Sequence, residues 1–288
     1  MTDTPFTHKH WQSADGLTLH FRDYAGGDAR LPVLCLHGLT RNARDFEALA
    51  PHIAATGRRV IVPEMRGRGR SGYASDPSTY AVPTYVADTL ALLAQEGVER
   101  FIAIGTSMGG LSIMGLAALA PERIAGVVLN DVGPVVEPAG LERIKDYVGQ
   151  GGSFPTWVHA ARALAEVHGE TYPGYDLTDW LEMAKRTMVL VSNGRIAFDY
   201  DMKIAEPILN VTTDEPVDLW PMLAALAGRP AVLVRGALST ILSAATLDRM
   251  AQTLPGARKV IVANTGHAPT LDEPEVRTAI DAMLEQAE

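Results

Sequence analysis

Gly105-Thr106-Ser107-Met108-Gly109 lies between an apolar run at residues 101–104 and a run of small and apolar residues at 111–120. This order predicts a strand, a sharp turn at Ser107 and a helix. The glycines remove Cβ atoms that would collide where the two elements meet. We expect the turn to expose the Ser107 hydroxyl and to leave the Met108 N–H at a helix N-terminus, where it favours an anion. The alternative interpretation is a glycine-rich turn with a buried serine.

The size and charge of the chain narrow the class of protein. It has 288 residues, 47% of them hydrophobic, and a formal net charge of −9 at pH 7. This composition suits one large globular α/β domain with an insertion or a small cap. The negative charge argues against a nucleic-acid partner. The basic run Arg66-Gly67-Arg68-Gly69-Arg70 is interpreted as a solvated loop.

Cysteine content and hydropathy give expectations about the compartment. Cys35 is the only cysteine, which fits a reducing environment and excludes an intrachain disulfide. The first residues lack the apolar core of a secretory signal, and no run is long enough to span a bilayer. We therefore expect a cytoplasmic protein with no membrane insertion. The oligomeric state is left open.

Apolar, β-branched runs alternate with helix-period segments along most of the chain. This alternation predicts an α/β fold with a mainly parallel central sheet flanked by helices. The expected strands are residues 17–24, 33–36, 60–62, 101–104, 127–129, 231–234 and 260–262, and the expected helices are 43–55, 85–96, 111–119 and 244–253.

The alternation stops in the middle of the chain. Residues 1–134 and 229–288 are expected to form the core, and residues 135–228 an inserted helical cap or lid. The segment is rich in aromatic and methionine side chains, most of which we expect to form its own core. Those that face the cleft would give a pocket suited to apolar acyl or aryl groups.

Polar and glycine-rich segments follow several expected strands. Ligands bind outside the carboxyl ends of parallel strands, so these segments mark a candidate site. They are His37-Gly38, Arg66-Gly67-Arg68-Gly69-Arg70-Ser71, the turn around Ser107, and Gly266-His267. With these residues the chain resembles the α/β-hydrolase superfamily along nearly its whole length, in particular its serine esterase and lactonase branch with a helical cap.

The resemblance implies roles for four residues. Ser107 would be the nucleophile and His267 the general base that accepts its proton and returns it to the leaving group. The backbone N–H groups of Met108 and Leu39 would form the oxyanion hole.

His37 is interpreted either as a cleft residue or as a buried histidine that organises the loop.

The acid of the expected triad departs from the family pattern. Relatives carry an aspartate at the position of Thr240, and threonine cannot neutralise an imidazolium. Asp131, which directly follows the expected strand at 127–129, is the best substitute carboxylate. It would otherwise anchor the cap entrance, and the choice between Asp131 and Thr240 as the partner of His267 stays open.

The leading hypothesis is a serine hydrolase that cleaves small carboxylic esters or lactones with apolar or aryl groups through an acyl-enzyme at Ser107. No cofactor and no metal are expected, because the histidines are scattered and no nucleotide signature is present. One alternative is carbon–carbon bond hydrolysis of a ring-cleavage product, with Arg41 and Arg44 binding a substrate carboxylate. The other is a weakly catalytic ligand-binding protein, motivated by Thr240.

Overall fold

The computed structural model describes residues 5–27, 29–209 and 217–287. Their strands are β1 Thr7–Gln12, β2 Thr18–Tyr24, β3 Val33–Leu36, β4 Val60–Glu64, β5 Phe101–Thr106, β6 Ile124–Asn130, β7 Ser153–Phe154, β8 Met188–Leu190, β9 Ile196–Phe198, β10 Ala231–Gly236 and β11 Arg258–Val262. Their α-helices are α1 Leu49–Ala54, α2 Val82–Gln95, α3 Met108–Leu119, α4 Pro138–Tyr147, α5 Trp157–His168, α6 Leu177–Thr187, α7 Glu206–Leu209, α8 Trp220–Ala224, α9 Ala244–Thr253 and α10 Pro274–Gln286. Short 3-10 helices are η1 Ala43–Phe46, η2 Pro77–Thr79, η3 Pro121–Arg123 and η4 Met202–Ala205.

Eight strands form one twisted sheet in the order β1-β2-β4-β3-β5-β6-β10-β11. The six strands from β4 to β11 run parallel, and β1 and β2 add an antiparallel edge. This confirms the expected α/β fold with a mainly parallel sheet. Because parallel strands share one direction, the carboxyl ends of the six strands lie at the same edge of the sheet, where the candidate site was expected.

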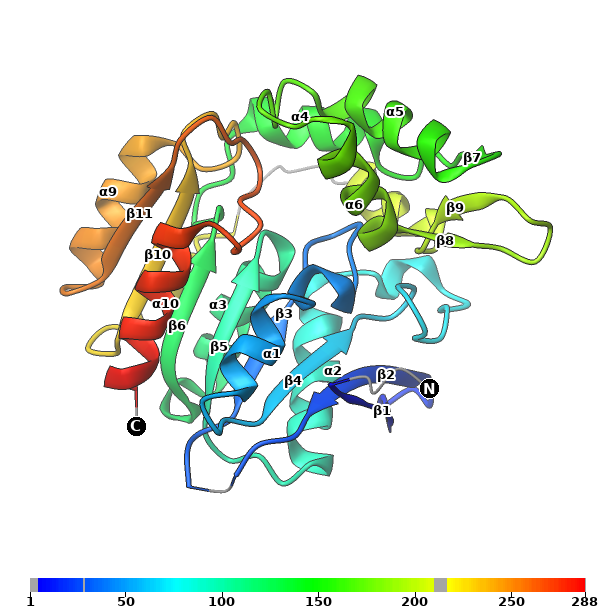
Figure 1. Cartoon of the computed structure of the whole chain (residues 1–288). Coiled ribbons are helices and arrows are strands. Elements are labelled where there is room, and N and C mark those ends of the chain that lie inside the picture. Colours follow the sequence, from blue (N-terminus) through cyan, green and yellow to red (C-terminus); the bar gives the residue numbers. More distant parts are fainter. Residues whose placement is uncertain (1–4, 28, 210–216, 288) are drawn as a thin grey trace.

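Helices cover both faces of the sheet, with α1 and α10 on one face and α2, α3 and α9 on the other (Figure 1). Residues of β5 alternate between the two resulting cores: Phe101 and Ala103 pack toward α2 and α3, whereas Ile102 and Ile104 pack toward α1 and α10. A strand buried on both faces reads as a continuous apolar run rather than an alternating one. This is why the central strands were recognisable in the sequence.

The expected helix at residues 43–55 is broken into η1 and α1. The Asn42 side chain caps η1 by accepting a hydrogen bond from the Arg44 N–H. Pro51 lies in the first turn of α1. In one continuous helix it would lie in the interior, where it lacks an N–H and its ring clashes with the preceding turn. The edge strand β1 was not predicted at all.

The elements from α4 to β9 lie beyond the carboxyl ends of the central strands (Figure 1). They are not only helical, because β7, β9 and β8 pair into a small antiparallel sheet. The segment expected to be a helical cap therefore also contains three short strands that the sequence did not indicate. Strands of two or three residues are too short to show an alternating pattern. The cap boundaries at 135 and 228 stay a prediction, and residues 210–216 of that segment lie outside the described residues.

In the basic run at residues 66–70, Arg70 is exposed, but the expectation of a solvated loop was wrong for Arg66 and Arg68. Arg66 is 1% exposed and forms ion pairs with Asp15 and Asp88, each at 2.8 Å. Arg68 is fully buried and donates to the carbonyl oxygen of Leu39 at 2.9 Å. The carboxylates that pair with Arg66 and the Leu39 carbonyl that binds Arg68 come from distant parts of the chain, so a local pattern of charge could not predict the burial. Among the described residues, no helix combines the length and the apolar character needed to cross a membrane.

Candidate active site

Ser107 lies at the turn between β5 and α3, as predicted. Its backbone adopts φ 53° and ψ −117°, a strained conformation for a residue other than glycine. A Cβ atom on Gly109 would overlap the carbonyl oxygen of Leu36 in β3. One on Gly105 would lie 2.6 Å from the Gly109 backbone carbon. Both glycines are therefore required by the close approach of α3 to the sheet.

Ser107, His267 and Asp131 form one hydrogen-bonded chain. His267 Nε2 lies 2.8 Å from Ser107 Oγ, and His267 Nδ1 lies 2.7 Å from Asp131 Oδ2. An ionised carboxylate only accepts hydrogen bonds, so Nδ1–H donates to Asp131 and Nε2 accepts from the serine hydroxyl. The three residues follow β5, β11 and β6, and the parallel sheet brings these strand ends together.

Asp131 is held in place by two further donors. Its side chain is fully buried, Oδ1 accepts from the Gly236 N–H at 2.8 Å, and Oδ2 accepts from Ser239 Oγ at 2.6 Å. Asp131 itself has φ 54°, and its N–H donates to the carbonyl oxygen of Val234. These contacts fix the orientation of the carboxylate toward His267.

Thr240 does not reach the histidine. It is exposed, and its hydroxyl forms no hydrogen bond with any part of the chain that the structure describes. Of the two residues between which the sequence could not choose, only Asp131 contacts His267. Ser239, which directly precedes Thr240 and donates to Asp131, is a site residue that the sequence patterns did not indicate. Its position in the same loop after β10 was the available signal.

Two backbone donors adjoin Ser107. Met108 is the first residue of α3, and within the described chain neither its N–H nor that of Leu39 has a protein acceptor. Donors of this kind at a helix N-terminus and in an adjacent loop suit an oxyanion. The sequence had suggested both positions.

His37 organises the loop that carries Leu39. It is fully buried, its Nδ1 donates to the Gly38 carbonyl oxygen at 2.7 Å, and its Nε2 accepts from the Met65 N–H at 3.1 Å. Burial lowers the pKa of His37 to about 4, which keeps the ring neutral and able to make both bonds. Because C=O and N–H point in opposite directions across a trans peptide, holding the Gly38 carbonyl also orients the Leu39 N–H. Of the two interpretations of His37, the structure supports the loop-organising one.

A cavity of about 540 Å³ opens above the serine, with Ser107 and His267 in its lining. Apolar and aromatic side chains from the elements beyond the sheet complete much of its wall. They include Ile144, Tyr147, Phe154, Leu164, Tyr172, Met183, Phe198 and Tyr200. Most of these aromatic residues and Met183 also pack in the separate hydrophobic core of the segment beyond the sheet. They therefore both form that core and line the cavity, as expected.

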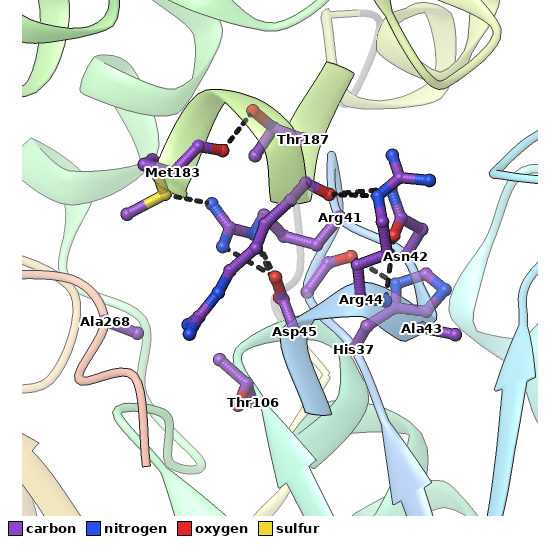
Figure 2. Close-up of polar contacts among 12 residues, drawn as sticks. His37, Arg41, Asn42, Ala43, Arg44, Asp45, Thr106, Met183, Thr187 and Ala268 are labelled. Carbon is purple, nitrogen blue, oxygen red and sulfur yellow. Dashed lines mark hydrogen bonds and ion pairs between the residues drawn. The ribbon is translucent and has the colours of Figure 1, made fainter. Parts of the chain in front are cut away.

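Arg41 and Arg44 are already paired. Three hydrogen bonds of 2.6–2.9 Å join the Arg41 guanidinium to Asp45, and Figure 2 shows Met183 on its other side. Arg44 forms an ion pair with Asp199 at 2.7 Å and donates to backbone carbonyls in and after α6. These contacts connect the core to the elements above it and leave neither guanidinium without a carboxylate partner. Within the described residues, no group of three or more His, Cys, Asp or Glu side chains is arranged to hold a metal ion.

Comparison with known proteins agrees with this geometry. Residues 32–274 match the model of the alpha/beta hydrolase fold family. A 3-hydroxybutyrate-oligomer hydrolase of Cupriavidus necator is 34% identical over 257 residues, which cover 86% of this chain and 87% of that protein. An esterase of Mycobacterium tuberculosis is 27% identical over 254 residues, 84% of this chain and 78% of the esterase.

A solved structure is similar over nearly its full length. The crystal structure of an alpha/beta hydrolase from Novosphingobium aromaticivorans superimposes with a TM-score of 0.94 at 59% sequence identity. The match covers 98% of this chain and 99% of that one. On the family match, the sheet topology and these relatives, this chain belongs to the alpha/beta hydrolase fold family.

Proposed function

We propose that this protein is a serine hydrolase that cleaves small carboxylic esters or lactones through an acyl-enzyme at Ser107, without a cofactor. The observation that carries the proposal is the hydrogen-bonded chain from Ser107 through His267 to Asp131, at the edge of a largely apolar cavity. The hydrolases and esterases among the relatives support the reaction class.

In the first half of the reaction, Ser107 Oγ attacks the carbonyl carbon of the ester while His267 Nε2 accepts the hydroxyl proton. Asp131 stabilises the imidazolium that forms, and its three donors keep it in the required orientation. The negative charge on the carbonyl oxygen is stabilised by the N–H groups of Met108 and Leu39.

The tetrahedral intermediate collapses when His267 donates the proton to the leaving alkoxide. This step breaks the carbon–oxygen bond of the ester and leaves the acyl group on Ser107. In the second half, a water molecule gives a proton to His267 and its oxygen attacks the acyl carbon. His267 then returns the proton to Ser107 Oγ, and the carboxylic acid is released.

Three observations bear on the alternatives. Thr240 in place of a carboxylate is the argument for a weakly catalytic binding protein, but the contact between Asp131 and His267 supports a complete triad. Carbon–carbon bond hydrolysis was linked to Arg41 and Arg44, whose pairing with Asp45 and Asp199 weakens that link. A relative named for hydrolysis of 3-hydroxybutyrate oligomers favours ester substrates.

A fluorophosphonate probe and an ester assay test the proposal. We expect the probe to label Ser107, and Ser107→Ala to abolish labelling and to lower ester turnover by a factor on the order of 10⁶. Ser112→Ala is the matched control, because Ser112 is buried in the same helix and its hydroxyl donates to the Met108 carbonyl. Labelling that survives in Ser107→Ala would refute the proposal. Faster turnover of a ring-cleavage product than of esters would favour carbon–carbon hydrolysis instead.

A further inference from the structure

One wall of the cavity carries polar groups that the proposed reaction does not use. Arg143 and Tyr147 lie four residues apart on α4, and His168 is the last residue of α5. Residues spaced by four share one face of a helix, so the first two are adjacent. The rings of Tyr147 and His168 meet edge to face, with centroids 5.1 Å apart. The same lining includes the apolar side chains of Ile144, Ala163, Leu164 and Val167.

Arg143 is the cavity arginine with the least charge compensation in the described chain. Arg41 and Arg186 form ion pairs of 2.6 and 3.0 Å with partly buried carboxylates. The nearest carboxylate to Arg143 is that of Glu170, at 3.6 Å and 90% exposed. A pair of this kind contributes little, because solvent screens it. Asp146 also lines the cavity, but it is exposed and forms no ion pair with Arg143 within the described residues.

Tyr147 and His168 have unused hydrogen-bonding capacity. Within the part of the chain that the structure describes, neither the Tyr147 hydroxyl nor a ring nitrogen of His168 has a hydrogen-bond partner. Burial lowers the pKa of His168 to about 4, with the charges of Arg41 and Arg143 acting in the same direction. Burial likewise raises the pKa of Tyr147. At neutral pH both rings are therefore uncharged, and each offers one donor.

We infer that Arg143, Tyr147 and His168 form a subsite for a carboxylate of the substrate, so that the preferred substrates are esters that also carry a free carboxylate. A guanidinium fork, a phenol and a neutral imidazole supply donors to one region, which matches the acceptor-only chemistry of a carboxylate. Esters between hydroxy acids have this composition. This inference rests on the proposed function, because it names the substrate class of the same site.

A matched pair of substrates isolates the carboxylate. The ester-linked dimer of 3-hydroxybutyrate carries a free carboxylate, which its methyl ester replaces with an uncharged ester group; only cleavage of the internal ester is compared. We expect the wild-type protein to cleave the internal ester of the free acid with the higher kcat/KM. In Arg143→Gln we expect kcat/KM for the free acid to fall by about 10- to 100-fold, the loss typical of a hydrogen bond to a charged group, and kcat/KM for the methyl ester to stay within about twofold.

Two further variants test whether the guanidinium of Arg143 causes the expected loss of kcat/KM. Arg143→Lys keeps the charge but loses the fork, so its kcat/KM for the free acid should lie between those of the wild type and Arg143→Gln. Lys145→Gln is the control, because Lys145 lies on the same helix but outside the cavity lining and pairs with Glu142. An equal loss on both substrates in Arg143→Gln, or a wild-type preference for the methyl ester, would overturn the subsite.

A binding measurement keeps this inference separate from the proposed reaction. Calorimetric titration of Ser107→Ala with the free-acid dimer should show binding that is at least about tenfold weaker in Ser107→Ala with Arg143→Gln. The absence of binding, or equal binding by both proteins, counts against the subsite. Failure of the proposed function has a different signature: no turnover of either substrate and no probe on Ser107, with the binding difference retained.

Discussion

Tyr172 Oη lies 2.8 Å from the carbonyl oxygen of Ala268 and 3.2 Å from its amide nitrogen, so one hydroxyl bonds both polar backbone groups of the residue after His267. The carbonyl oxygen of Thr171, the residue before Tyr172, accepts a 2.6 Å hydrogen bond from the Gly266 N–H. The segment between α5 and α6 therefore binds both residues next to His267, Gly266 before it and Ala268 after it. Movement of that segment would move His267 relative to Ser107.

We expect Tyr172→Phe to lower kcat by a factor on the order of 10 with little change in KM, because the histidine loop loses its anchor while the cavity keeps its shape. Tyr175→Phe is the control: its ring stacks on Tyr172 at 4.6 Å, and its hydroxyl forms no hydrogen bond within the described residues. The rate of fluorophosphonate labelling measures the Ser107–His267 pair directly. If Tyr172→Phe lowers the melting temperature but leaves the labelling rate unchanged, its role is structural only.

Asp131 and Thr240 give a paired test of the triad acid. Asp131→Asn should lower kcat on the order of 10⁴-fold, because an amide cannot stabilise the imidazolium and can fix the wrong tautomer of His267. Thr240→Asp should change kcat by no more than about twofold, since its side chain is exposed and away from the histidine. Steady-state kinetics on one ester are sufficient. A large gain in Thr240→Asp together with a small loss in Asp131→Asn would reverse the assignment.

A substitution at Gly109 tests how closely α3 packs against β3 at the turn that carries Ser107. Gly109→Ala should destabilise the protein by about 1–3 kcal/mol, because the added methyl must displace either α3 or β3 at the Leu36 carbonyl. Gly174→Ala is the matched control, since a Cβ there meets no heavy atom within 4 Å. Urea unfolding of both variants gives the comparison. Equal stabilities for the two would show that the turn adjusts without cost.

Glu64 makes stability dependent on pH. Burial raises the pKa of its carboxyl, but hydrogen bonds from His20 at 2.8 Å and the Arg70 N–H at 2.7 Å outweigh burial and bring it below the usual 4.5. The native state thus binds the Glu64 proton more weakly than the unfolded state. The resulting stability is fully present above pH 4.5 and is lost as pH falls through the lowered value.

We therefore expect Glu64→Gln to lower the free energy of unfolding by about 2 kcal/mol at pH 7, with the deficit shrinking in acid. Glu99→Gln, at an exposed position, should follow the wild type at every pH. Denaturant unfolding at several pH values between 7 and 3 measures both. A deficit that is constant with pH would show that the contribution of Glu64 is not electrostatic.

Local patterns were enough to predict much of the sheet and the strand-turn-helix that carries Ser107. The central strands are buried on both faces, so their apolar runs stood out. Gly105 and Gly109 marked a close approach that the structure requires. The short strands β7, β8 and β9 carried no comparable signal. The apolar pattern of residues 43–55 predicted one helix, but the structure has two, with Pro51 in the first turn of the second.

By itself, the sequence determined the α/β fold and the elements that carry Ser107, His267 and the two backbone donors, because strand and helix periodicity and turn glycines are local properties. Only the tertiary structure decided that Asp131 rather than Thr240 contacts His267, that Ser239 supports Asp131, and that Arg66 and Arg68 are buried. Each of these depends on partners distant in the chain. Hydrogen bonds and ion pairs act over a few ångströms, and sequence separation does not show which strand ends the sheet brings within that range.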